Sequence, residues 1–169
     1  FQNLNVGNVG KTLIIKESKP TEKLDFCNIT IYSNRPFSNI KLSDLSELNI
    51  SSQLMVDELQ IEMKDQAKFI GSVLSNKAKI SMKDKTRLNL LGKTLEANIN
   101  IQDSASIIAP YWYVSKLKIH SKNANYTEIS VAEELEGVIE NTSKFYYYGE
   151  PNKKLTQKDK ALIEKKNLQ

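Results

Sequence analysis

The sequence predicts an all-β fold, a parallel β-helix of about six to seven turns with roughly 20 residues each. Three observations support this prediction. Similar lines of sequence recur along the chain, apolar and polar residues alternate within each line, and every line has an Asp or Asn at the same place. A period near 20 is too short for a helix pair, which needs about 33 residues or more, and the leucine-rich-repeat signature is missing.

Six lines of the repeat can be aligned. They begin at Ser38, Leu59, Ala78, Ala97, Leu117 and Leu135. Successive starting points are 21, 19, 19, 20 and 18 residues apart. One line cannot bury its own apolar side chains, but stacked turns about 4.8 Å apart bury those of their neighbours. We therefore expect equivalent residues to lie above one another.

Each line is predicted to form a strand, an Asx bend and a second strand. Apolar residues at the third and fifth positions alternate with polar ones, which is the period of a strand with one buried face. The third position holds Ile40, Ile61, Ile80, Ile99, Ile119 and Gly137. The seventh position holds Asp44, Asp65, Asp84, Asp103, Asn123 and Asn141. Asp and Asn suit a bend because their side chains bond nearby backbone and tolerate left-handed conformations.

The flanks differ from these lines. We predict one β-helix domain over residues 1–152, with lead-in strands over 11–36 and aligned turns over 37–151. Residues 153–169 are predicted to be a basic C-terminal tail whose composition favours a short helix with Thr156 as N-cap. This tail has six lysines against one Asp and one Glu, an excess equal to the net charge of +4. The sequence leaves open whether the tail packs on the last turn.

Composition excludes several classes of protein. The basic surplus lies in the tail rather than along a folded face, so nucleic acid is not an expected partner. No apolar run approaches the roughly 18 residues of a transmembrane helix. Because the chain begins at Phe1, we expect that an upstream segment was removed. Cys27 is the only cysteine, which rules out an internal disulfide, and strand alternation predicts that it is buried.

The whole column pattern resembles the bacterial family called putative auto-transporter adhesin, head GIN domain (DUF2807). In that family the bends read Gly-Ser-Gly and the array ends in Tyr-x-Gly-x-Pro. Here the ending is YYYGEP, with Tyr147, Gly149 and Pro151 in those places, but the bends read Asp-x-small. The resemblance covers about residues 11–151. It implies a right-handed β-helix in an exported periplasmic or cell-surface protein, with no catalytic residues and no cofactor.

The stacked aspartates are one candidate site. Carboxylates about 5 Å apart repel each other by roughly 1 kcal/mol in water, and a Ca²⁺ ion bridging neighbouring turns would offset this repulsion. Some β-helix polysaccharide lyases look similar in using clustered acids. The simpler interpretation is structural, because Asp favours bends and nearby lysines such as Lys64 and Lys83 balance the charge. The candidate metal ligands are Asp44, Asp65, Asp84 and Asp103.

Two aromatic trios are the other candidate. Alternate residues of a strand point outward, and exposed rings could stack on sugars or dock a partner protein. The alternative is that the rings pack over a corner or against the tail. The predicted ligand-binding residues are Tyr111, Trp112, Tyr113, Tyr146 and Tyr148.

No motif for catalysis or phosphate binding is found, and His120, the only histidine, is expected at the surface. We therefore expect a non-enzymatic, exported binding or structural module of the bacterial cell envelope, with a glycan or surface protein as partner. The alternative is a carbohydrate-active enzyme or calcium-dependent glycan binder that uses the Asp column. A third hypothesis is self-association through the open solenoid ends.

Overall fold

The computed structural model describes residues 4–18 and 27–168, and the chain divides into two compact units at residues 34/35. In the first unit, β1 (Leu4–Val9) and β2 (Thr12–Glu17) form an antiparallel hairpin. Of the lead-in strands expected over 11–36, β2 is formed, whereas the described residues 27–34 form no strand and pair with none. Cys27 is accordingly exposed, so its predicted burial was wrong.

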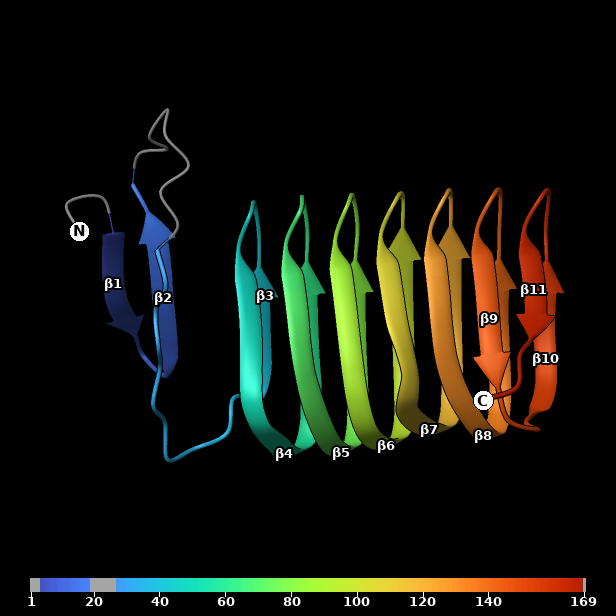
Figure 1. The fold of residues 1–169 in the computed structure, drawn as a ribbon, viewed down its shortest axis with the longest axis horizontal. Helices are drawn as coiled ribbons and strands as arrows, with labels where there is room; N and C mark the ends of the chain where they lie inside the picture. Colours follow the sequence, from blue (N-terminus) through green and yellow to red (C-terminus); the bar gives the residue numbers. More distant parts are fainter. Residues whose placement is uncertain (1–3, 19–26, 169) are drawn as a thin grey trace. The chain divides into compact units, whose positions relative to one another are not determined.

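The second unit is a parallel β-solenoid, as predicted. Each long strand begins after one Asx bend, turns at the opposite edge and ends at the next bend, so the strands form two layers (Figure 1). All pairings between these strands are parallel. The strands are β3 (Asn39–Leu42), β4 (Glu47–Met63), β5 (Lys68–Met82), β6 (Arg87–Gln102), β7 (Ser106–Lys122), β8 (Tyr126–Ile139), β9 (Lys144–Tyr148), β10 (Asn152–Gln157) and β11 (Leu162–Lys165).

The predicted stacking of equivalent residues is confirmed. Ile61 pairs with Ile80, and Ile80 pairs with Ile99 on the next turn. In the same column Gly137, which has φ 148°, lies between Ile119 and Leu155 of the neighbouring turns. A Cβ atom at this position would lie 1.8 Å from the carbonyl oxygen of Ile119. Glycine is therefore required here by the close approach of two backbones.

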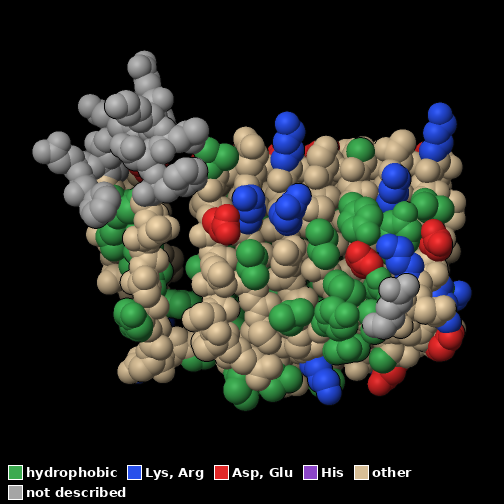
Figure 2. Space-filling view, viewed as in Figure 1, with side chains coloured by type: hydrophobic (Ala, Val, Ile, Leu, Met, Phe, Trp, Pro, Cys, Tyr) green, Lys and Arg blue, Asp and Glu red, His purple; other side chains and the backbone are tan. Residues whose placement is uncertain are grey.

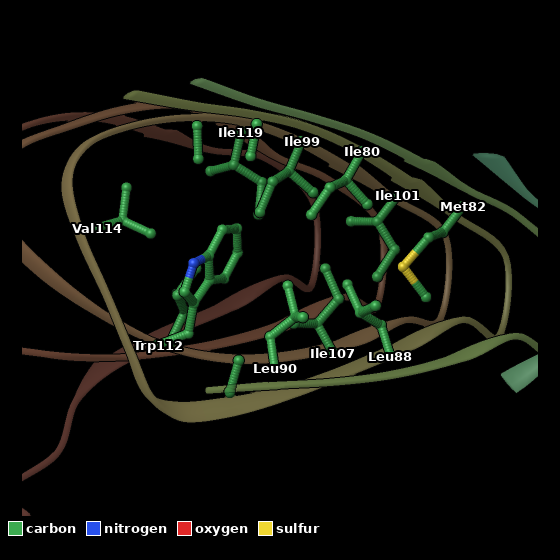
Figure 3. Close-up of a cluster of buried hydrophobic side chains, with 14 of the residues drawn as sticks. Ile80, Met82, Leu88, Leu90, Ile99, Ile101, Ile107, Trp112, Val114 and Ile119 are labelled. Atoms are coloured by element: carbon green, nitrogen blue, oxygen red, sulfur yellow. The ribbon is translucent and has the colours of Figure 1, made fainter. Parts of the chain in front are cut away.

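The core lies between the two layers. Isoleucine, methionine and leucine side chains from both layers meet along the solenoid axis (Figure 3). Trp112 is fully buried in this core. Its indole Nε1 donates to Thr94 Oγ1 at 2.9 Å, and Thr94 also bonds Ser75 at 2.9 Å. The interior thus accommodates the indole because its polar atom has a partner.

The predicted helical tail was wrong. β10 pairs with β8 and β11 pairs with β9, so residues 152–165 form a further turn of the solenoid. Asp159, between these strands, has φ 58°, as at the earlier bends. Pairing satisfies the backbone of the β8–β9 edge and packs Leu155 and Ile163 against the core, which outweighs local helix preference. The expected boundary at 152/153 therefore falls inside the solenoid.

The two layers give the solenoid two outer faces. We call the outward side chains of segments that follow the Asx bends the front face, which includes β9 and β11 (Figure 1). The outward side chains of segments that precede the bends form the rear face, which includes β3 and β10. Among the described residues, no helix has the length and apolar character needed to span a membrane.

Candidate functional site

The Asp column has a structural role at the bends. Every Asx residue of the column has a left-handed backbone, with φ between 58° and 77°. The backbone N–H of Asp44 donates to Asp65 Oδ2 at 3.1 Å, and that of Asp65 donates to Asp84 Oδ2 at 3.2 Å. Farther along, Asn123 Nδ2 donates to Asp103 Oδ1 at 2.7 Å. The side chains of Asp65, Asp84 and Asp103 therefore link neighbouring turns at the bends.

The same contacts bear on the calcium hypothesis for Asp44, Asp65, Asp84 and Asp103. Within residues 4–18 and 27–168, no group of three or more His, Cys, Asp or Glu side chains is arranged to hold a metal ion. Carboxylate oxygens that a Ca²⁺ ion would need already accept hydrogen bonds from the adjacent bends. The calcium site stays a prediction, and nothing in this geometry favours it over the structural role.

The aromatic trios divide between surface and core. Tyr111 is 51% exposed and Tyr113 is 44% exposed, as expected for alternating residues. Trp112 is 0% exposed, so its ring is unavailable to a ligand and it leaves the candidate set. Tyr148 is only 8% exposed, whereas Tyr146 is half-buried. The predicted set thus retains Tyr111, Tyr113 and Tyr146 at the surface.

Tyr146 belongs to a group of side chains on the front face. β8 supplies Tyr126 and Glu128, β9 supplies Tyr146 and Tyr148, and Lys166 follows β11. We call these five residues the tyrosine cluster. Parallel pairing places Glu128 directly beside Tyr146 on the next turn. The cluster therefore joins three successive turns of the solenoid.

The Glu128 carboxylate is the centre of the tyrosine cluster. Its Oε2 accepts a hydrogen bond from the Tyr126 hydroxyl at 2.9 Å. Its Oε1 accepts one from the Tyr148 hydroxyl and lies 3.4 Å from Lys166 Nζ. Three donors from three turns thus meet one carboxylate whose side chain is 16% exposed. Such charge-assisted contacts are stronger than those between neutral groups.

The rings of the cluster are also fixed. The centroids of Tyr126 and Tyr146 are 5.4 Å apart with an interplanar angle of 44°. Lys166 Nζ lies 3.9 Å from the centroid of Tyr146, which is the geometry of a cation–π contact. On this face, hydrophobic side chains gather over the C-terminal turns with charged side chains among them (Figure 2). The result is an ordered aromatic surface.

Electrostatics favour the charged form of Glu128. Burial alone would raise its pKa, but the hydrogen bonds from Tyr148 and Tyr126 and the charge of Lys166 lower the pKa below its usual value. Burial raises the pKa of Tyr148, and the bond to Glu128 raises it further. Burial would lower the pKa of Lys166, but the charge of Glu128 raises it. At neutral pH Glu128 is therefore a carboxylate, Lys166 is an ammonium and the phenol of Tyr148 is neutral.

His120 lies on the rear face. Its side chain is 53% exposed, as expected, and its Nε2 lies 2.8 Å from Glu140 Oε1. Glu140 also lies 3.9 Å from Lys158 Nζ. The hydrogen bond with His120 is the main reason that the pKa of Glu140 is lowered. Glu140 thus links side chains of three successive turns.

Sequence reasoning missed Tyr126, Glu128 and Lys166. The signal for the first two was present, since Glu128 and Tyr146 both occupy the twelfth position of their lines, but residues at this outward position differ from line to line and form no recognisable column. Lys166 follows a seventh line that begins at Lys153, with Asp159 at the seventh position and Ile163 at the eleventh. The helix-forming composition of this seventh line hid its agreement with the six earlier lines.

The fold and surface described so far are those of a parallel β-solenoid whose outward side chains vary from turn to turn. The family described as "Putative auto-transporter adhesin, head GIN domain" (DUF2807) matches residues 1–151, and the chain belongs to this family. A crystal structure of a putative adhesin from Parabacteroides merdae ATCC 43184 is similar, with a TM-score of 0.64 and 18% sequence identity. The match covers 97% of this chain and 78% of that one, and it supports the fold. The search of curated proteins gives no match.

Proposed function

We propose that this domain is a non-enzymatic, exported binding module of the bacterial cell envelope. It holds a glycan or surface protein through the tyrosine cluster together with Tyr111. The family, whose name describes an adhesin head, supports the class of function and an exported location. The observation that carries the proposal is the Tyr146 ring, which is partly exposed and held between Tyr126 and Lys166.

Rigid aromatic side chains are well suited to binding. A side chain that is already ordered loses little conformational freedom when a ligand binds, so more of the contact energy appears as affinity. Tyr146 is ordered by its ring and cation contacts, and Tyr148 is ordered by Glu128. Tyr111 is half-exposed and follows Pro110, whose carbonyl accepts a hydrogen bond from Ser130, the residue that pairs with Tyr148, so a further ring lies near this surface. Sugar rings and apolar protein side chains both pack on such surfaces.

The alternative is a carbohydrate-active enzyme or a calcium-dependent glycan binder that uses the Asp column. No specific observation favours it, because Asp65 and Asp84 accept hydrogen bonds from the backbone of neighbouring bends. These two functions differ in their dependence on calcium and in the surface that they use.

A glycan array probed with and without calcium tests the proposal. We expect calcium-independent binding that Tyr111→Ala and Tyr146→Ala each weaken by about tenfold, the effect of losing an aromatic contact. Tyr32→Ala is the matched control, because Tyr32 is 93% exposed and lies in the N-terminal unit. A pull-down from envelope extracts with the same variants tests for a protein partner.

Two results would contradict the proposal. The first is a wild-type domain whose binding is unchanged by both tyrosine substitutions. The second is binding or glycan turnover that disappears on chelation and in the Asp65→Asn, Asp84→Asn double variant, which would favour the alternative instead.

A further inference from the structure

A hollow on the rear face lies near the first turns of the solenoid. Its volume is about 430 Å³, which is within the range of about 300–1,000 Å³ that is common for ligand sites. Its lining comes from β3, β4 and β5 and the residues just after them, and includes the inward residues Leu42, Ile61 and Met63 as well as outward ones. Those that carry polar groups include Lys41, Gln60, Lys64, Lys79, Ser81 and Lys83. We call this region the basic hollow.

Most of the positive charge in the basic hollow has no acidic partner. Glu62 is the one acid of the lining, and it pairs with Lys41 at 3.0 Å. In the part of the chain that the structure describes, Lys64, Lys79 and Lys83 form no ion pair.

The register explains this lack of partners. Lys79 lies beside Gln60 on one side and Asn98 on the other. The N–H of Lys83 donates to the Met63 carbonyl, which places Lys83 beside Lys64 on the adjacent turn. Like charges on neighbouring strands repel each other.

The same face is arranged differently at the other end of the solenoid. There two lysines of β7 meet glutamates on the adjacent turn. Lys116 pairs with Glu134 at 2.8 Å and Lys118 with Glu136 at 3.7 Å. The backbone is the same in both places, so the unpaired lysines of the basic hollow are a property of its sequence alone. An anionic ligand would supply the negative charge that Glu134 and Glu136 supply to the lysines of β7.

We propose that the basic hollow binds an anionic polysaccharide whose sulfate or carboxylate groups contact Lys64, Lys79 and Lys83. Each ammonium group offers three hydrogen-bond donors to such anions. The backbone positions of Lys79 and Lys83 are about 13 Å apart on one strand, so charges spread along a chain of sugars match them better than a single ion. Ser81 and Gln60 lie between the lysines and offer hydrogen bonds to sugar hydroxyls.

This site is independent of the tyrosine cluster. The basic hollow is on the rear face near β3, whereas the cluster is on the front face of β8, β9 and β11. The two surfaces can therefore be tested separately, and the failure of one proposal leaves the other standing.

Titration of the whole domain with oligosaccharides of equal length tests the proposal. The probes are a heparin-derived hexasaccharide for sulfate, a hexagalacturonate for carboxylate and a neutral dextran hexasaccharide. We expect at least one anionic probe to bind in about 50 mM salt, and its affinity to fall as salt is raised, because screening weakens exposed charge contacts. The neutral probe should not compete.

Two triple variants make the test specific. Lys64→Gln, Lys79→Gln, Lys83→Gln should lower the affinity by about tenfold or more, given the modest strength of each exposed contact. Lys116→Gln, Lys118→Gln, Lys122→Gln removes the same charge from the same face and should change the affinity less than about twofold. Thermal unfolding of each variant confirms that it is folded.

Three results would overturn the proposal. They are no binding of either anionic probe at low salt, an equal loss in both triple variants, and binding that resists the substitutions in the basic hollow. An equal loss would mean that affinity follows net charge rather than this site.

Discussion

The N-terminal and C-terminal halves of the solenoid share one backbone but arrange their polar side chains differently. On the rear face, Lys79 near the N-terminal end faces neutral neighbours, whereas Lys118 in the C-terminal half faces Glu136. At the bends, Asp65 accepts from a backbone N–H, whereas Asn141 donates from its side chain to Asn123. On the front face, the C-terminal half alone has the tyrosine cluster.

This difference indicates that the columns of inward side chains and the columns of outward side chains follow different constraints. Inward positions must match from turn to turn because they fill one continuous core, and Ile61, Ile80 and Ile99 do so. Outward positions need only remain soluble, so they are free to carry charge pairs in one half and unpaired lysines in the other. Binding functions of a solenoid are therefore expected in its outward columns.

The largest effect is expected when the C-terminal half loses its last turn. Deleting residues 153–169 removes β10 and β11, which uncovers the strand edges of β8 and β9 and the core side chains beneath Leu155 and Ile163. An exposed parallel edge can pair with another chain. We expect larger species in light scattering, consistent with self-association through a solenoid end. A truncated chain that remains an unchanged monomer would count against this expectation.

The next largest effect is expected at Gly137. Replacing it with Ala should destabilise the domain by about 3 kcal/mol or more, because the new Cβ would clash with the Ile119 carbonyl at a strained φ. Gly7→Ala is the control, since no atom lies within 4 Å of a Cβ built there. Chemical denaturation measures both. Equal stability of the two variants would show that the turns are not packed this closely.

A moderate effect is expected at Glu128. Glu128→Gln should lower the free energy of unfolding by about 1–2 kcal/mol, because it removes the charge that three donors share. The lowered pKa of Glu128 adds a pH dependence. Its contribution is complete above the unfolded value of about 4.3 and is lost as pH falls through the lower folded value.

The free energy of unfolding, measured with denaturant at a series of acidic pH values, tests this pH dependence. The wild type should lose stability faster than Glu128→Gln as pH falls below about 4. Parallel curves for the two proteins would mean that Glu128 is not held as a carboxylate by its neighbours. Glu133→Gln, an exposed change on the same strand, provides the control.

The smallest effects compare the rear-face lysines directly. Lys83→Gln should raise the melting temperature slightly, because it relieves repulsion with Lys64, and Lys118→Gln should lower it slightly, because it removes the pair with Glu136. Each shift should be on the order of 1 °C at low salt and smaller at high salt. Shifts of the same sign would contradict the difference between the two halves.

The inward columns made the solenoid predictable from the sequence, whereas the last turn and the first unit were not. Columns of isoleucine and Asx residues specify stacked turns because packing and bend geometry repeat with the chain. The last turn was mistaken for a helix, since Lys, Ala, Leu and Glu favour helices locally while edge pairing decides the structure. The strand expected around Cys27 failed because alternation alone does not supply a pairing partner.

The candidate site was only partly predictable for a related reason. Alternation predicted that part of each trio points outward, but a trio such as Tyr111, Trp112 and Tyr113 does not reveal which phase faces the core, and Trp112 is buried. The role of Glu128 depends on residues 2, 20 and 38 positions away in the chain. Such a group becomes visible only when the register of every turn, including the last, is known.

Mapping backbone amide shifts by NMR while adding the anionic hexasaccharide that binds more tightly tests most directly whether the two halves carry separate surfaces. Our account predicts changes within residues 60–64 and 79–83, little change within 116–122, and no change in the tyrosine cluster. Changes that are equal in β5 and β7, or that centre on residues 153–166, would contradict it.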